Sequence, residues 1–226
     1  MSSEPPISEW PIPDLLPADV LRADLPPEPP LPQSFYDRDV VQVARELVGK
    51  RIYRLSRSGI AVGRIVETEA YLAAGDSACH ATRGMTRKNA SMFGPPGRAY
   101  VYSIHARWCL NTVTQPRGVP SAVLIRAVQP LLGIERMQRR RNLERTIDLA
   151  RGPSRLCEAF QIDRRLDGWD LSRGRRLWLT PDPDVPVPDH RIGNSPRIGV
   201  TSAFELCLRF YLRGSEYVSG PKRLRT

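Results

Sequence analysis

The sequence predicts a single mixed domain of the α+β class. Three observations carry this prediction. The chain has 226 residues, 41% of them hydrophobic, which is enough for one sizeable core. One early segment has apolar residues at helical spacing, whereas several later segments alternate as strands do. No internal repeat is visible.

The first expected element is a helix over residues 36–49. Its valines, alanine and leucine recur so that they can share one face. Asp37 or Asp39 is placed to cap the start of this helix. Gly49 lies where helices commonly stop.

The other expected elements are mainly strands. A turn at residues 57–59 indicates a hairpin. The strands expected from alternation cover 51–56, 60–70, 98–105, 107–113 and 121–128, with further strands inside 172–199 and 203–213. Helices are expected over 130–140 and 153–161, and a long polar loop with a short helix over 75–97.

Residues 1–33 differ from the remainder of the chain. They contain ten of the 22 prolines and carry a charge of −5, so we expect a Pro-rich acidic tail, flexible or draped over the body. Residues 34–226 would then form the domain. These 193 residues carry a charge of +15, which favours a polyanion partner, DNA or RNA.

The sequence contains no apolar run long enough to cross a membrane and no recognisable secretory signal. None of the cysteines forms a CxxC pair, which argues against a zinc or iron–sulfur site. We therefore expect free thiols and no metal or organic cofactor. The four cysteines are Cys79, Cys109, Cys157 and Cys207.

The strand over 60–70 delivers two carboxylates, Glu67 and Glu69, to the same face because they are two residues apart. A Glu-x-Glu pair on its own is usually a solvated surface feature. The residues that follow change this interpretation, because they add rings, an amide and a guanidinium beside a basic loop. They are Tyr71, His80, Tyr100, Tyr102, Asn111 and Arg126.

With these residues in place, the sequence resembles the 3-methyladenine DNA glycosylases of the alkyladenine glycosylase type. The similarity runs from about residue 35 to residue 220. It rests on VETEAYL (66–72), His80, TRKNASMFGPPGRAYVYSI (86–104), CLN (109–111), VLIRAVQP (123–130), ARGPSRLC (150–157) and LRFYLRGSEYVS (208–219). The resemblance implies a curved, mostly antiparallel sheet flanked by helices, like that of the formyltransferase C-terminal domain.

The resemblance also implies roles for individual residues. Glu69 matches the carboxylate that deprotonates the attacking water, and Arg126 the guanidinium that helps to hold that water. Backbone groups near 150–152 would complete the shell of the water. Tyr71, His80 and Tyr102 match the residues that enclose an extruded base, and Asn111 matches an amide that excludes normal guanine.

The sequence departs from the family pattern where a tyrosine would wedge into the duplex. The string after the Tyr-Val-Tyr strand is one residue shorter, and His105 stands at the wedge position beside Ile104. A histidine stacks with less area than a tyrosine. Arg87 and Lys88 are candidate phosphate contacts in the preceding loop.

The implied chemistry agrees with physical expectation. Cleavage of an N-glycosidic bond builds positive charge on the sugar, which a buried carboxylate can stabilise while it accepts a proton from water. The base must first leave the stack. With no lysine near Glu69 in the motif, we expect a monofunctional enzyme without a Schiff base. We expect a monomer acting on double-stranded DNA with damaged purines, cytoplasmic and nucleoid-associated in a bacterium or nuclear in a eukaryote.

Three alternatives stay open from the sequence. A metal-dependent nuclease would use Glu67 and Glu69 to hold Mg²⁺, but it would need a third acid. A DNA damage-binding module would keep the pocket without catalysis. A binding domain like the formyltransferase C-terminal domain would share the sheet and lack the constellation around Glu69.

Overall fold

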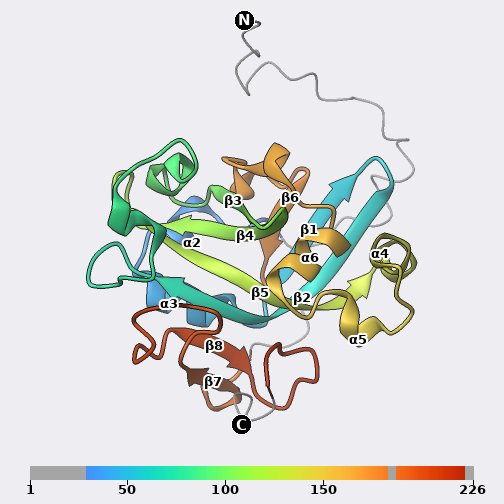
Figure 1. Cartoon of the computed structure of the whole chain (residues 1–226). Helices are drawn as coiled ribbons and strands as arrows, with labels where there is room; N and C mark the ends of the chain where they lie inside the picture. Colours follow the sequence, from blue (N-terminus) through green and yellow to red (C-terminus); the bar gives the residue numbers. More distant parts are fainter. Residues whose placement is uncertain (1–28, 183–186, 222–226) are drawn as a thin grey trace, which may run out of the picture.

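The computed structural model describes residues 29–182 and 187–221. The sheet has eight strands, and all of its strand pairings are antiparallel (Figure 1). The strands are β1 (Arg51–Ser56), β2 (Gly59–Tyr71), β3 (Ala99–Ile104), β4 (Arg107–Thr114), β5 (Ser121–Leu132), β6 (Leu177–Thr180), β7 (Ile192–Ser195) and β8 (Arg209–Leu212). The predicted α+β class is therefore confirmed.

Strand β2 is the longest element and organises the sheet. One edge pairs with β5 along nearly its whole length, while the other edge pairs first with β1 and then with β8. The main path runs β3-β4-β5-β2-β1-β6, and β7 is attached through β8. Register shifts between Ile65 and Thr68 interrupt the β2–β5 ladder, as β-bulges that bend a strand do. Glu67 therefore lies within the irregular part of the strand, and Glu69 follows directly after it.

The helices pack against this sheet and form the main core with it. The α-helices of the described residues are α2 (Gln33–Tyr36), α3 (Val40–Leu47), α4 (Ile134–Arg141), α5 (Thr146–Leu149) and α6 (Pro153–Ala159). Helix α3 contacts β2, β5 and β8, and α6 contacts β4 and β5. Short 3-10 turns cover His80–Arg83, Ala90–Phe93, Arg164–Leu166, Leu171–Arg173 and Asp189–Arg191.

The helix expected over 36–49 is shorter in the structure, where α3 covers Val40–Leu47. The side chain of Asp39 accepts hydrogen bonds from the backbone amides of Val41 and Gln42, so α3 begins after this cap. The helix ends at Leu47. Gly49 has a positive φ of 94° and donates its amide hydrogen to Ile65 of β2.

The helix expected over 130–140 was placed too early. Strand β5 continues to Leu132, and Gly133, with φ of 78°, turns the chain into α4 at Ile134. The apolar pair Leu131–Leu132 does not distinguish the end of a strand from the start of a helix, which explains the error. Helix α5 was missed.

Residues 1–28, which include most of the predicted tail, lie outside the described residues. The residues just before position 33 pack on the body. Leu31 is buried in the main core and donates its amide hydrogen to the carbonyl of Leu179 in β6. Within the described ranges, no helix is long and apolar enough to cross a membrane.

Candidate active site

Strand register gathers the expected site residues on one face of the sheet. In adjacent strands Tyr100 lies opposite Asn111, Asn111 opposite Leu124, and Leu124 opposite Glu69. In the neighbouring row, Tyr102 lies opposite Cys109. Since side chains alternate along a strand, these residues face away from the core partners of the same strands. Residues separated by up to 55 positions in the sequence thus meet in one place.

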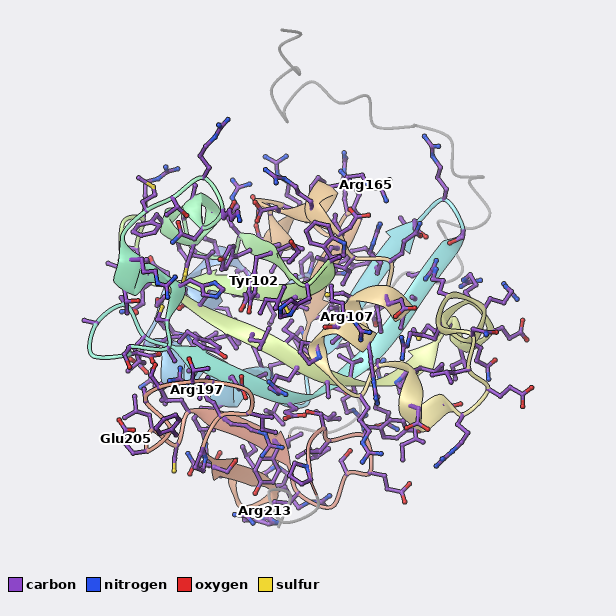
Figure 2. The ribbon with its side chains drawn as sticks, viewed as in Figure 1. Tyr102, Arg107, Arg165, Arg197, Glu205 and Arg213 are labelled. Atoms are coloured by element: carbon purple, nitrogen blue, oxygen red, sulfur yellow. The ribbon has the colours of Figure 1, made fainter. Side chains whose placement is uncertain are left out.

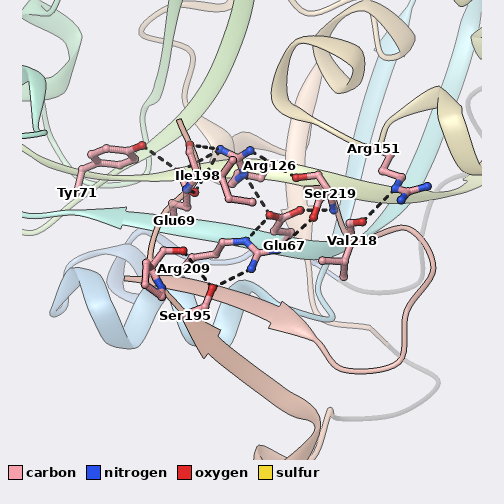
Figure 3. A network of polar contacts seen from close by, with 11 residues as sticks. Glu67, Glu69, Tyr71, Arg126, Arg151, Ser195, Ile198, Arg209, Val218 and Ser219 are labelled. Carbon is pink, nitrogen blue, oxygen red and sulfur yellow. Dashed lines mark hydrogen bonds and ion pairs between the residues drawn. The ribbon is translucent and has the colours of Figure 1, made fainter. Parts of the chain in front are cut away.

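The carboxylate of Glu69 is fully buried and held from three directions (Figure 3). The backbone amide of Ile198 donates to Oε1 over 2.7 Å, and the hydroxyl of Tyr71 donates to Oε2 over 2.9 Å. Nη1 of Arg126 lies 3.2 Å from both carboxylate oxygens. This set of donors fixes the carboxylate without using all of its acceptor sites.

Arg126 bridges the two carboxylates of β2. Its Nε donates to Glu67 over 3.2 Å, and its Nη1 also donates to the carbonyl of Ile198 over 3.1 Å. Glu67 in turn accepts hydrogen bonds from Nε of Arg209 at 2.6 Å and from the amide of Ser219 at 2.7 Å. The result is a buried network of two acids and two arginines that leaves Arg126 little freedom to move.

The two carboxylates differ in basicity. Burial is the main influence on Glu69 and raises the pKa of this carboxyl, although Arg126, the Ile198 amide and Tyr71 act in the opposite direction. Burial also acts on Glu67, but its two arginine partners and hydrogen bonds hold the pKa of this carboxyl below the usual value. Glu69 is therefore the better proton acceptor of the pair.

A cluster of rings lies beside the carboxylate. His80 comes from the loop after β2, and its ring centroid is 4.5 Å from that of Tyr102 at an interplanar angle of 75°. Its Nδ1 is 2.9 Å from the hydroxyl of Tyr100. Tyr71 and Tyr102 pack against the same small buried cluster, which contains Tyr100 and Cys79. The three expected base-binding rings thus lie together on one face of the sheet.

The protonation of these rings follows from their surroundings. Burial, and then the neighbouring charge of Arg83, lower the pKa of His80, which keeps its imidazole neutral near pH 7. Burial raises the pKa of Tyr71 and Tyr102 far above the physiological range, so both hydroxyls stay protonated. The hydroxyl of Tyr71 therefore acts as a donor to Glu69.

Asn111 is buried between the aromatic cluster and the carboxylates. Its side-chain amide donates to the carbonyl of Tyr100 over 3.0 Å, which fixes the orientation of the amide. The thiol of Cys109, on the same face, is hydrogen-bonded to Tyr102, and burial raises its pKa.

The predicted DNA-contacting residues lie apart from the carboxylates. Ile104 and His105 stand at the exposed end of the β3–β4 hairpin, where His105 and Ala106 have φ of 47° and 60°. A two-residue turn with both φ positive is the tightest common hairpin connection. Figure 2 labels Tyr102 and Arg107 on the two strands of this hairpin. Arg87 and Lys88 are exposed in the loop after His80.

Two expectations about the surroundings of the site need comment. The water shell expected from backbone groups near 150–152 stays a prediction; in the structure the carbonyl of Ala150 accepts the amide of Val128. The backbone amide that contacts Glu69 itself comes from Ile198, which the sequence did not indicate. The sequence reasoning also left Tyr100 without a role, although its alternation with Tyr102 places both on one face.

The arrangement does not resemble a metal site. Glu67 and Glu69 are each ion-paired with an arginine, and positive charge between them is unsuitable for holding a cation. In residues 29–182 and 187–221, no three potential metal-ligating side chains of His, Cys, Asp or Glu come together. The arrangement instead provides a proton acceptor in Glu69, a fixed positive charge in Arg126 and a cluster of aromatic rings. This combination suits a hydrolase that acts next to an aromatic group.

Comparison with known proteins agrees with this class. A family model described as methylpurine-DNA glycosylase matches residues 34–216. A protein of Mesorhizobium japonicum is 48% identical over 198 residues, which cover 87% of this chain and 93% of that protein. A protein of Rhodopirellula baltica is 47% identical, with 84% and 83% covered. A protein of Koribacter versatilis is 41% identical, with 90% and 99% covered.

All three relatives carry the name "Putative 3-methyladenine DNA glycosylase". The length and identity of these matches show that the chain belongs to the methylpurine-DNA glycosylase family. It is therefore a DNA glycosylase, a repair hydrolase that acts on N-glycosyl bonds in damaged DNA.

Proposed function

We propose that this enzyme turns a damaged purine out of double-stranded DNA and hydrolyses its N-glycosidic bond with a water activated by Glu69. One observation carries the proposal: a fully buried carboxylate of raised pKa lies within hydrogen-bond distance of a tyrosine that belongs to the aromatic cluster. A base held among the rings would have its sugar close to this carboxylate.

In the proposed reaction, Glu69 accepts a proton from water as the oxygen of that water bonds to the sugar carbon. The bond from that carbon to the purine nitrogen breaks, and its electron pair leaves with the base. Arg126 and the carbonyl of Ile198, joined over 3.1 Å, provide a donor and an acceptor to orient the water. The negative charge of Glu69 also stabilises the positive charge that develops on the sugar.

The rings compensate for the stacking that the base loses. Tyr71 would face one side of the base, while His80 and Tyr102, already in edge-to-face contact, would face the other. Stacking on an aromatic side chain contributes about 1–3 kcal/mol per base, which is comparable to the cost of flipping a poorly paired base. Asn111 would lie at the pocket wall and crowd the exocyclic amine of a normal guanine.

The names of the relatives support 3-methyladenine as a substrate. We also consider 7-methylguanine, hypoxanthine and ethenoadenine. Alkylated purines that carry a positive charge are attracted to the faces of tyrosine rings. Damaged bases also pair weakly and are easier to extrude.

The enzyme would bind DNA through the positively charged surface of residues 34–226. Arg165 and Arg213, which Figure 2 labels near the outline of the molecule, are exposed arginines of this domain. In this proposal Arg87 and Lys88, which are exposed, contact phosphates, and Ile104 with His105 inserts at the position that the base has left. The chain has three lysines, Lys50, Lys88 and Lys222, and none adjoins Glu69 in the motif. We therefore propose that the enzyme is monofunctional and leaves the abasic strand uncut. We also propose that it acts as a monomer.

The decisive experiment incubates the protein with duplexes that each carry one of these lesions. Release of free base, followed by strand cleavage only after alkali treatment, is the expected result. Activity should persist in EDTA, because no step needs a metal. Strand cleavage without alkali, or loss of activity in EDTA, would support the nuclease alternative. Lesion binding without base release would support the damage-binding module.

A further inference from the structure

The buried guanidinium of Arg197 lies over one face of the Tyr71 ring. The guanidinium carbon of Arg197 lies 4.6 Å from the ring centroid, within the range of a cation–π contact. Arg197 makes a two-pronged ion pair with Asp76, with distances of 2.6 Å and 2.7 Å, and both side chains have no exposed surface. Arg197 comes from the segment after β7, 126 positions later in the chain than Tyr71.

The ion pair is fixed in place and stays charged. Asp76 accepts the backbone amides of Leu72 and Ala78, and Arg197 also donates to the carbonyl of Ala70 over 3.0 Å. Burial alone would raise the pKa of Asp76, but the hydrogen bonds from Arg197 and these amides lower it overall. Burial would lower the pKa of Arg197, but Asp76 raises it overall. The guanidinium therefore remains a cation in the folded enzyme.

The position of Arg197 links it to the reacting groups without direct contact. The next residue, Ile198, donates its amide to Glu69 and accepts from Arg126. Tyr71 donates its hydroxyl to Glu69. One face of the Tyr71 ring is occupied by Arg197, so only the opposite face is available to a base.

A cation on one face of a tyrosine draws electron density in the ring toward itself. The opposite face then attracts a second cation less strongly. From this geometry we infer that Arg197 is a positioning residue that acts through Tyr71 and sets the preference between charged and neutral damaged purines. It reduces the advantage of cationic alkylated bases, so that neutral damaged bases are held comparably well. This inference rests on the proposed function.

The test replaces the ion pair by a neutral pair of similar shape, Asp76→Asn with Arg197→Gln. The specificity constant kcat/KM is measured on matched duplexes that carry 7-methylguanine, which is cationic, or hypoxanthine, which is neutral. The ratio of the two constants should rise about two- to fivefold in favour of the cationic base. A merely structural role would lower both constants together and leave the ratio unchanged.

Three further variants support the interpretation of this ratio. Asp76→Leu with Arg197→Met replaces both charged side chains by apolar ones and should shift the ratio in the same direction. This second double variant provides the same test if the first one does not fold. Arg197→Lys keeps the charge and should keep the ratio near that of the wild type. Arg64→Gln with Asp182→Asn neutralises another ion pair, 2.6 Å apart and partly buried, that involves the first half of β2, and should leave the ratio unchanged.

An unchanged or reduced ratio in both neutral pairs, with both bases still released, would overturn the inference and leave the proposed function intact. An equal rise in the Arg64 and Asp182 variant would overturn it as well. Wild-type protein that releases neither base would overturn the proposed function, and the inference with it.

Discussion

The carboxylate network on β2 and the tip of the β3–β4 hairpin are built in opposite ways. In the network, Glu67, Glu69 and Arg209 have no exposed surface, and each donor is matched to an acceptor. At the hairpin tip, Ile104 is 48% exposed, and His105 beside it is exposed. The proposed chemistry would thus have a rigid, buried setting, whereas the surface proposed to enter DNA is exposed in the free protein. The two regions should respond differently to mutation.

The largest effect is expected at Glu69. Glu69→Gln retains the shape of the side chain but cannot accept a proton, so base release should fall by about 10²–10⁴-fold. Binding to a lesion duplex should stay within a few-fold of the wild type, because the substitution leaves the exposed DNA-contacting residues intact. Single-turnover release and a binding titration check this pair of outcomes. A parallel loss of binding would contradict the separation between the two regions.

Glu67 should matter most for stability. Glu67→Gln leaves Arg209 without its ion-pair partner at 2.6 Å, so the free energy of unfolding should fall by about 3–5 kcal/mol. Chemical denaturation measures this loss. Glu135→Gln is the matched control, because Glu135 faces Arg139 across 4.0 Å on an exposed helix surface. A surface pair of this kind contributes little, and the control should unfold like the wild type.

The pH profile should report the raised pKa of Glu69. The carboxylate is a base only when ionised, so the rate should fall as the pH drops through its pKa in the folded enzyme. Because burial raises that pKa, the acid limb should lie above about 4.3, the usual value for glutamate. At pH values below the pKa of Glu69 in the folded enzyme, single-turnover rates should drop about tenfold per pH unit. An acid limb at or below the ordinary value would contradict the assignment of Glu69 as the base.

The smallest effect is expected at the hairpin tip. Ile104→Ala removes exposed apolar surface and should weaken binding to a lesion duplex by about two- to tenfold, with no change in the free energy of unfolding. Titration at constant salt checks the first expectation and denaturation the second. Phe204→Ala, at a side chain that is 60% exposed on another loop, is the control. A lower free energy of unfolding in Ile104→Ala would mean that this side chain stabilises the folded protein, contrary to the comparison.

The sequence allowed the fold class, most strands and the carboxylate pair to be predicted, because alternation along a strand is a local signal. It did not reveal Arg197, Ile198 or Arg209 as partners of the site. These residues follow Glu69 by more than 120 positions, and their contacts depend on how β8 pairs with the second half of β2. No local pattern encodes that pairing. Asp76 was missed for the same reason, because the role of this loop aspartate depends on its ion pair with Arg197, which is distant in the sequence.

The pairing of β8 with β2 also has a consequence for synthesis. The groups that complete the carboxylate network, from Arg197 to Ser219, are translated after every other part of the described site. A nascent chain on the ribosome can already possess Glu69, Arg126 and the rings, yet it lacks the amides that seat both carboxylates. Ribosomes that stop before codon 198 would therefore release a product in which the proposed catalytic residues are present but the carboxylate network is incomplete.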